Sequence, residues 1–298
     1  MSRGDDARDL EPGTLYLVAT PIGNLEDMSP RALAVLGAAD LILAEDTRHS
    51  RRLLEHFGLH RPLQSWHEHN ERAGIDAVLE RLGSGAAVAL VSDAGMPLIS
   101  DPGYPLVRAV HRAGLRVCPV PGPSALLAAL AASGLPTDRF FFEGFLPPRP
   151  AARRARLQAL RGQAATLVFY EAARRVAASL ADMAEVLGAG RPACLARELT
   201  KRHEHIRPGT LGALAGVLAA GEEPARGEFV VVVGGCPPPP PGAPTAEQLR
   251  VLEVLAAELP ASRAAALAAA LTGADRKALY RWLSNRPGRP GGSGPAAE

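Results

Sequence analysis

The chain has 298 residues, enough for about two domains, and its 47% hydrophobic content supplies a sizeable core and excludes disorder of the whole chain. The formal net charge is only +2, so charge alone does not indicate a nucleic-acid partner. No apolar run reaches the roughly 20 residues of a membrane span, and the acidic first residues lack a signal peptide's apolar stretch, so we expect a cytoplasmic protein without a membrane partner.

Apolar, strand-like runs alternate with amphipathic patterns through the first half of the chain. The runs predict strands at 14–20, 40–44, 86–92, 115–120 and 140–143. The patterns between them predict helices at 30–36, 50–57, 75–82, 104–113 and 124–133. Continuous apolar strands separated by helices are typical of a mostly parallel sheet covered on both faces. We therefore predict an α/β domain over residues 14–143.

Proline-rich segments divide the rest of the chain. Three prolines in 144–150 predict a linker, and a second α/β domain is expected over 151–236, with strands at 166–170, 193–198 and 228–233 and helices at 151–160, 174–187 and 211–219. Five consecutive prolines then open a linker at 237–244. Three short helices, at 245–259, 262–271 and 275–283, predict a small helical domain over 245–285, with Ser262 and Asp275 as N-caps. A disordered tail is expected at 286–298.

Loops that follow the predicted strands of the first domain are the place to look for a site, because open parallel sheets bind ligands beyond the carboxyl ends of their strands. These loops lie at 20–24, 45–52, 92–103 and 121–125. They are rich in small residues and prolines, which let backbone groups approach a ligand. None contains G-x-G-x-x-G or a P-loop, so neither of those phosphate-binding modes has its usual support. Taken singly, each loop is also compatible with a tight turn.

Six segments occur in order between about residues 14 and 235: TPIGNLED, EDTRHS, SDAGMPLISDPG, PGPSA, VFYE and RELTKRHE. Together they resemble the ribosomal RNA small subunit methyltransferase I family, within the tetrapyrrole methylase fold. The resemblance implies a two-domain α/β fold of the class III methyltransferases, with S-adenosylmethionine held in the cleft between the domains. It also implies a homodimer that methylates the ribose 2'-hydroxyl of a decoding-centre cytidine of 16S ribosomal RNA, in the small ribosomal subunit. The three helices after the prolines resemble a small helical domain that some members carry.

The same resemblance implies the residues that contact the cofactor, which are Pro21, Gly95, Met96, Pro97, Ile99, Ser124, Ala125 and Tyr170. The loops at 95–99 and 121–125 agree chemically, because they offer backbone groups and a hydroxyl without lysine or arginine, which suits a sulfonium cation. Ser124 is equally compatible with a helix N-cap. Two features depart from the family pattern: Met96 stands where a threonine is usual, and residues 172–175 replace a Ser-Pro-His-Arg-like run.

Methyl transfer can be accelerated largely by alignment of the reacting atoms, and a base that removes the hydroxyl proton can help. Candidates for that base are the polar groups at the strand ends, namely Glu45, Asp46, His49, Glu171, Glu198 and Lys201. Glu45 and Asp46 are equally compatible with a structural cluster around Arg48. The His67–His69 and His203–His205 pairs have a spacing that suits zinc on a strand, but nothing in the sequence brings them together, and we predict no metal.

Arginine accounts for 31 of the 33 basic residues, since only Lys201 and Lys277 are lysine, and a GC-rich genome explains that preference. It does not explain the distribution: residues 1–148 carry a net charge of −5 and residues 149–298 carry +7. Seven arginines lie between residues 149 and 175, against one acid. We therefore predict a surface for RNA phosphates that includes Arg48, Arg51, Arg153, Arg154, Arg197 and Arg202.

Two other functions stay open on the sequence. A methylase of a tetrapyrrole or another small molecule would share the fold, and fold alone does not decide between substrates. The basic clusters favour RNA over that alternative. An RNA-binding ribosome assembly factor without activity is the second alternative, and Met96 is the feature that keeps it open.

Overall fold

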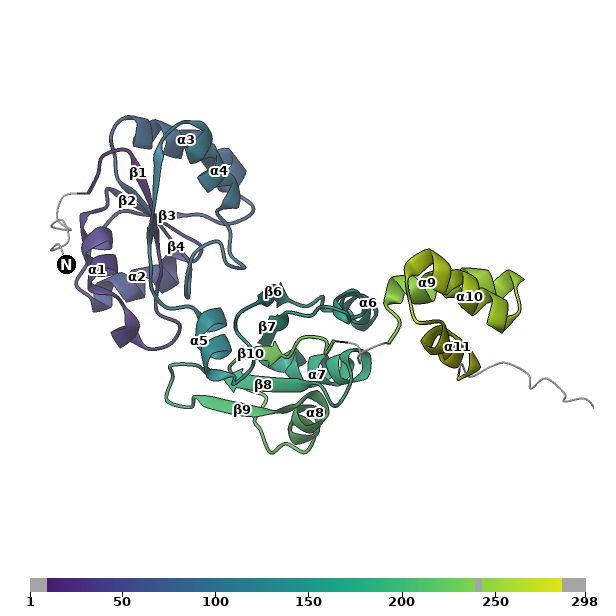
Figure 1. Ribbon diagram of the computed structural model, residues 1–298. Coiled ribbons are helices and arrows are strands. Elements are labelled where there is room, and N and C mark those ends of the chain that lie inside the picture. The colour runs from purple at the N-terminus through teal and green to yellow at the C-terminus, as the bar shows by residue number, and fades with distance from the viewer. Residues whose placement is uncertain (1–9, 239–242, 286–298) are drawn as a thin grey trace, which may run out of the picture. The chain divides into compact units, whose positions relative to one another are not determined.

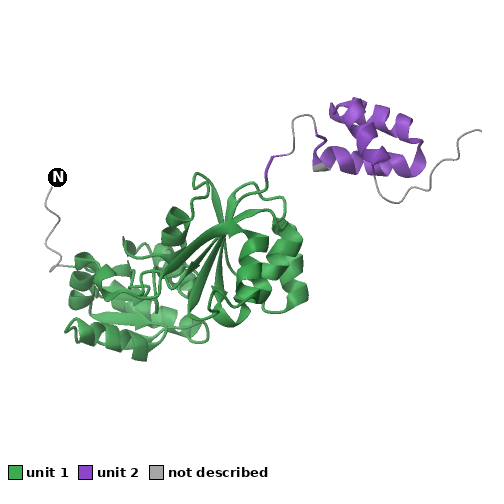
Figure 2. Ribbon diagram, turned by 90° about the horizontal axis from the view of Figure 1, so that it is seen from below, with its two compact units in different colours: residues 1–236 green, residues 237–298 purple. Residues whose placement is uncertain are grey.

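The computed structural model describes residues 10–238 and 243–285, which belong to two compact units, 1–236 and 237–298 (Figure 2). The first unit contains two five-stranded sheets with helices packed on their faces (Figure 1). The second unit consists of three helices. Among the described residues, no helix is long and apolar enough to cross a membrane. Residues 239–242 of the expected linker, which include three of the five consecutive prolines, and the expected tail at 286–298 lie outside the described residues.

The first sheet is parallel throughout, in the order β3-β2-β4-β1-β5. Its strands are β1 (Thr14–Val18), β2 (Leu41–Ala44), β3 (Leu63–Ser65), β4 (Val88–Val91) and β5 (Arg116–Val120). The helices between them are α1 (Pro30–Ala38), α2 (Thr47–His56), α3 (Glu71–Gly83) and α4 (Tyr104–Arg112). The predicted parallel sheet is confirmed. Sequence patterns do not predict β3, because its three residues include only one apolar side chain.

Alternation of side chains along these strands produces two apolar layers. One layer packs on α1 and α2, as with Val18 and Ile42 against Val35. The opposite layer packs on α3 and α4, as with Leu43 against Val78 and Leu106. Both faces of the sheet are therefore covered by helices. The polar loops lie at the ends of the strands.

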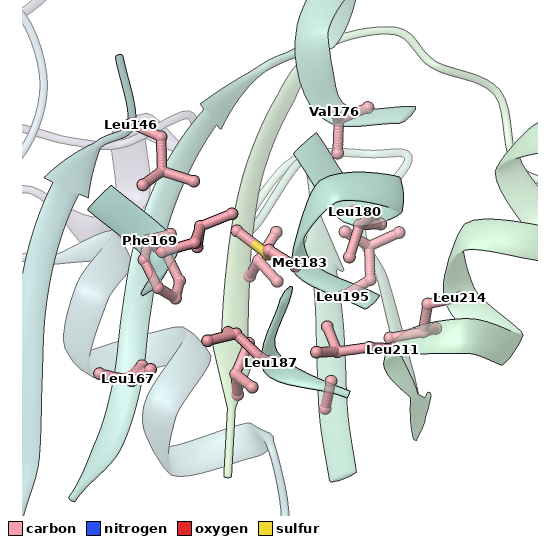
Figure 3. Packing of buried hydrophobic residues seen from close by; sticks show 14 of the residues in the cluster. Leu146, Leu167, Phe169, Val176, Leu180, Met183, Leu187, Leu195, Leu211 and Leu214 are labelled. Atoms are coloured by element: carbon pink, nitrogen blue, oxygen red, sulfur yellow. The ribbon is translucent and has the colours of Figure 1, made fainter. Parts of the chain in front are cut away.

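The second sheet is mixed, in the order β6-β7-β10-β8-β9, and only β6 and β7 run parallel. Its strands are β6 (Phe140–Phe145), β7 (Thr166–Ala172), β8 (Pro192–Arg197), β9 (His205–Thr210) and β10 (Glu228–Val233). One face packs on α6 (Pro150–Leu160), α7 (Ala173–Leu187) and α8 (Leu211–Ala219), where Phe169, Met183 and Leu214 belong to one buried cluster (Figure 3). The other face packs on α5 (Ala125–Ala132) through residues such as Leu130, Val168 and Val230.

The predicted boundary between the two α/β parts is wrong. Residues 140–145 form one strand of the second sheet, with a bulge between Phe142 and Gly144, so 140–143 does not end the first part and 144–150 is not a linker. Helix α5 also packs on the second sheet, which places the change of sheet before it. A short apolar strand has the same sequence pattern whichever sheet it joins, because tertiary contacts decide which strand it pairs with. The prolines after Leu146 mark only the turn into α6.

The C-terminal unit contains α9 (Ala246–Glu258), α10 (Ala261–Thr272) and α11 (Arg276–Ser284), around a core that includes Leu252, Ala265 and Leu279. The Asp275 cap is confirmed, because its side chain accepts a hydrogen bond from the Lys277 amide. The Ser262 cap is wrong: Pro260 occupies the N-cap position of α10, and Ser262 lies inside the helix.

Candidate active site

A pocket of about 450 Å³ lies where the loops of the first sheet meet β7 and β10 of the second. Ile22, Glu45, Asp93 and Ser124 enter it from the loops after β1, β2, β4 and β5. Tyr170 and Val230 line the opposite side, from β7 and β10. Small-molecule sites usually occupy roughly 300–1,000 Å³, so the pocket is large enough for a nucleoside-sized ligand.

The loop after β4 forms the largest part of the pocket wall. Thr20 and Gly95 exchange two backbone hydrogen bonds, of 2.9 and 3.0 Å, which tie this loop to the end of β1. Gly95 has a φ of +82°, a conformation that costs glycine little and other residues more. Leu98 and Ser100 also have positive φ, at 73° and 71°. Side-chain-bearing residues rarely adopt this conformation unless their surroundings impose it, and such strain concentrates at functional sites.

Six of the eight residues expected to contact the cofactor line the pocket: Gly95, Met96, Ile99, Ser124, Ala125 and Tyr170. Pro21 and Pro97 do not; both are buried beside it. Ser124 occupies the N-cap position of α5, but its side chain makes no capping hydrogen bond. Its hydroxyl is therefore not committed to the helix, which favours a contact with a ligand over the capping alternative.

Tyr170 joins the two sides of the pocket. Its hydroxyl oxygen accepts a hydrogen bond of 3.2 Å from the Leu126 amide, in the first turn of α5. Its ring lies edge-on to the rings of Phe142 and Phe145, with centroids 4.9 and 5.7 Å away. Burial raises the pKa of Tyr170, so the hydroxyl stays protonated and can donate to a ligand while it accepts from α5.

The three candidate bases after β2 occupy different positions. Glu45 lines the pocket, and burial together with the charge of Asp93 raises its pKa. Asp46 caps α2 by accepting hydrogen bonds from the Arg48 and His49 amides, which lower its pKa, and it does not line the pocket. His49 is exposed on α2, away from the pocket lining. The structural cluster is limited to Asp46 and Arg48, whose side chains approach to 3.6 Å.

Glu171 is wrong as a candidate base. Its carboxylate is 1% exposed, with 2.7 Å to the Arg175 guanidinium and 2.6 Å to the Ser179 hydroxyl, and it also accepts the Ala172 amide. With these partners both oxygens are occupied, so the group holds the end of β7 onto α7. The residue borders the pocket, but its carboxylate is not available to accept a proton from a substrate.

Lys201 bridges two carboxylates at the edge of the pocket. Its ammonium lies 2.8 Å from Glu198 and 2.9 Å from Glu228, and of these only Glu228 lines the pocket. Its aliphatic stem crosses Gly23, where a Cβ atom would collide with it. Burial opposes ionisation of Glu198, but hydrogen bonds from Lys201 and the Glu228 amide outweigh it and lower the pKa of Glu198. The ion pairs therefore tie the loop after β8 to the start of β10 within the second sheet, and only the aliphatic stem of Lys201 reaches the loop after β1.

Lys201→Met is expected to lower the free energy of unfolding by about 1 kcal/mol at neutral pH, because two carboxylates lose their shared cation. The wild-type advantage is present above the ordinary pKa of a glutamate and is lost as the pH falls through the lowered pKa of Glu198. Urea denaturation at neutral and acidic pH measures the difference. Arg202→Met is the control, since Arg202 is exposed and forms no ion pair within the described residues. Equal destabilisation by both variants would contradict the bridge.

The arginines expected to bind RNA fall into three groups. Arg48, Arg51 and Arg202 are exposed. Arg153 and Arg197 are wrong as RNA contacts: Arg153 is buried on Asp182 at 2.6 Å, and Arg197 pairs with Glu223 at 2.6 Å and is only 14% exposed. Arg154 is half-exposed but also reaches Asp182. Acids distant in sequence neutralise these guanidinium groups. Counting the basic and acidic residues of a segment does not reveal such pairing.

Several residues that line the pocket are not among those that the sequence motifs indicate, namely Asp93, Ser100, Asp101, Phe145, Leu199, Gly227 and Glu228. Asp93, Ser100 and Asp101 lie inside the SDAGMPLISDPG segment, so the signal for them was present. Phe145 fell within the expected linker and is 54% exposed, unusual for phenylalanine. Glu228 begins a strand, and no local pattern distinguishes it.

The histidine pairs lie apart from a common site. His67 and His69 contact each other edge-on at 5.8 Å, while His205 pairs with Glu223 at 2.6 Å. Within the described part of the chain, no group of three or more His, Cys, Asp or Glu side chains could hold a metal ion.

Comparisons with known proteins agree with this geometry. Residues 14–215 match the model of the tetrapyrrole (corrin/porphyrin) methylases, and residues 242–286 match the RsmI C-terminal HTH domain. Uroporphyrin-III C-methyltransferase from Thermus thermophilus, complexed with S-adenyl homocysteine, is 20% identical, with a TM-score of 0.51 over 74% of this chain and 97% of that one. This likeness shows the fold.

Closer relatives define the family. Ribosomal RNA small subunit methyltransferase I of Xylella fastidiosa is 55% identical over 90% of this chain and 98% of its own. Its counterpart from Pseudomonas aeruginosa is 54% identical over 94% and 100%. The chain belongs to the ribosomal RNA small subunit methyltransferase I family.

Proposed function

We propose that this protein transfers the methyl group of S-adenosylmethionine to the ribose 2'-hydroxyl of a cytidine in 16S ribosomal RNA. Relatives that share about half of their residues with this chain bear the name of a ribosomal RNA methyltransferase. That relation favours RNA over a tetrapyrrole, because the tetrapyrrole enzyme is similar at the level of fold only. The decoding-centre position and the assembled small subunit as substrate come from the family resemblance.

The charge of the pocket is the observation that supports S-adenosylmethionine as the methyl donor. Among the described residues that line it there are five acids and neither lysine nor arginine. S-adenosylmethionine supplies a methyl group on a sulfonium cation, and an acidic, partly enclosed surface attracts such a cation. The first turn of α5 adds amide donors at Ser124 and Ala125, which suit the carboxylate of the amino-acid end of the cofactor.

Residues that can approach RNA surround the pocket. Arg202, together with Lys201 and Thr200, lines a shallow groove beside Gly23 and Asn24. Arg48 and Arg51 lie on the exposed side of α2, just after the loop that carries Glu45. These cations contact phosphates in the proposal, while the pocket takes the methyl donor and the target ribose. We further propose that the protein acts in the cytoplasm as a homodimer, as the family resemblance implies.

The test is methyl transfer from labelled S-adenosylmethionine to 30S subunits, naked 16S RNA and a tetrapyrrole, followed by digestion of the RNA to nucleosides. The expected product is 2'-O-methylcytidine, formed in at least one RNA sample. Label on the base of the nucleoside would overturn the ribose assignment. Label in the tetrapyrrole alone would favour a small-molecule methylase. Cofactor binding without transfer to any acceptor would favour an assembly factor without activity.

A further inference from the structure

Charge is divided unevenly among the three helices of the C-terminal unit (Figure 1). Helix α9 carries three acids against one arginine. Helix α11 carries Arg276, Lys277 and Arg281 and contains no acid. Three of the five basic residues within 243–285 therefore lie on the last helix of the unit.

These basic residues lie on one exposed side of α11. Positions 276, 280 and 284 are four residues apart, and positions 277 and 281 form the adjacent row, so their side chains are neighbours on the helix surface. Leu279 and Leu283 belong to the buried core of the unit. We call the exposed surface the α11 face; it consists of Arg276, Lys277, Tyr280, Arg281 and Ser284, all of which are exposed. None of its three cations forms an ion pair with a described residue.

The stability of the helix does not explain where two of these cations lie. Arg276 and Lys277 are in the first turn of α11, whose end of the helix dipole is positive and favours anions. Asp275 caps this turn, but its carboxylate accepts from the Lys277 amide rather than pairing with the ammonium. Only Arg281 lies in the last turn, where a cation is favoured. An anionic partner accounts for the two cations of the first turn.

Tyr280 adds an aromatic ring in the middle of the α11 face. The ring is 47% exposed, although it follows Leu279, which is fully buried. Unpaired bases of RNA stack on exposed aromatic rings, and neighbouring cations bind the phosphates of the same strand. The other large apolar side chains that this unit exposes are on α9 and α10, namely Val254, Leu267 and Leu271. The α11 face is therefore cationic and aromatic, a combination that suits a nucleic-acid strand.

The connection between α10 and α11 also places α11 for such a contact. Three residues, 273–275, join the two helices, and Gly273 takes a φ of 70° at the end of α10. Helix–turn–helix proteins have turns of this length, and their second helix contacts the nucleic acid. The major groove of an RNA helix is too deep and narrow for side chains to read. Phosphates and an unpaired base are the groups that remain for α11 in RNA.

We propose that the α11 face binds an unpaired segment of the substrate RNA, with Arg276, Lys277 and Arg281 on its phosphates and Tyr280 stacked on one of its bases. The inference rests on the proposed function and adds an RNA contact to the cations around the pocket. Two RNA-binding units on one chain bind more tightly than either alone, because the second contact becomes intramolecular. The C-terminal unit thus supplies affinity for RNA, while methyl transfer belongs to the first unit.

The first test measures binding of the full-length protein to labelled 16S RNA between about 50 and about 200 mM salt. Each lost phosphate contact lowers the slope of log affinity against log salt by about 0.7–0.9. The double variant Arg276→Gln with Arg281→Gln should therefore bind about tenfold more weakly or worse at the lower salt, with a slope smaller by about 1.5.

The matched control removes the same charge from the other two helices. Arg250→Gln with Arg263→Gln changes exposed arginines of α9 and α10 that form no ion pair with a described residue. This variant should keep the wild-type slope and an affinity within about twofold of wild type. Equal losses in the two double variants would overturn the assignment to α11. Because all four arginines are exposed, melting temperatures close to that of wild type should show that both variants are folded.

Tyr280 tests the stacking separately from the charge. Tyr280→Ala should weaken RNA binding by about fivefold or more without a change in the salt slope, and Tyr280→Phe should restore the affinity. Wild-type affinity in Tyr280→Ala would overturn the stacking. Duplex DNA should compete poorly with 16S RNA for the wild-type protein, since its bases are paired. Equal competition would overturn the assignment to RNA.

Methyl transfer separates this inference from the proposed function. Arg276→Gln with Arg281→Gln should raise the KM for RNA, with kcat and S-adenosylhomocysteine affinity unchanged, because the lost contacts only bind the substrate. If wild type forms 2'-O-methylcytidine and this variant keeps wild-type affinity and salt slope, the α11 inference is overturned and the proposed function stands. If wild type binds RNA through α11 and methylates no ribose, the proposed function alone is overturned.

Discussion

Arg153→Met should unfold at a markedly lower urea concentration than wild type while the protein that remains folded binds RNA unchanged. The Arg153 side chain is 5% exposed and contacts Asp182 at 2.6 Å through two nitrogens, between α6 and α7. Removal of one partner of a buried ion pair typically costs 3–5 kcal/mol, because the other charge stays buried; since Arg154 also reaches Asp182 at 3.3 Å, we expect about 3 kcal/mol.

Two comparisons separate burial from charge. The double variant Arg153→Met with Asp182→Leu removes both charges and should recover most of the lost stability, since well-packed apolar pairs often replace buried ion pairs. Arg174→Met removes an exposed arginine of the same segment, without an ion pair in the described residues, and should change the free energy of unfolding by less than about 0.5 kcal/mol. Were Arg153→Met as stable as Arg174→Met but weaker in RNA binding, the buried pair would be refuted.

Ala125→Phe should weaken S-adenosylhomocysteine binding by about 100-fold or more, nearly 3 kcal/mol, because the new ring occupies the pocket where α5 begins. Leu127→Phe enlarges a side chain of the same helix that is 54% exposed and outside the pocket lining, and it should leave affinity unchanged. Calorimetry measures both affinities, and melting temperatures show whether each variant is folded. Equal affinity of the two folded variants would place the cofactor elsewhere.

Apolar patterns along the sequence predict four of the five strands of the first sheet, all except β3. Its strands are continuous apolar runs such as Leu41–Ala44, and burial on both faces leaves little alternative to a parallel sheet. The second sheet is harder to predict from the sequence. Phe140–Phe145 pairs with β7 across a bulge, and no local sequence pattern in that strand indicates which strand it pairs with. The sequence does not predict β9 either, because HIRPGT contains a proline and a glycine, which are unfavourable within a strand.

The site residues likewise differ in whether the sequence alone indicates their role. The strand-end argument indicates the loops that hold Gly95, Met96 and Ser124, because the carboxyl ends of parallel strands meet at one edge, and the family resemblance implies these particular residues. Arg153 could not, because its partner Asp182 is 29 residues away and only the packing of α6 on α7 brings them together. The same holds for Glu171. The sequence shows an acidic residue at a strand end, while the structure shows that its carboxylate is hydrogen-bonded to Arg175 and Ser179.

The most direct test of the cofactor site is an experimental structure of the protein with S-adenosylhomocysteine bound. We expect the ligand to lie between the loop at 95–101 and Tyr170, with its amino-acid end at the first turn of α5, near Ser124. Density for the ligand at any place outside this pocket, in a protein that binds it stoichiometrically, would contradict this assignment of the cofactor site.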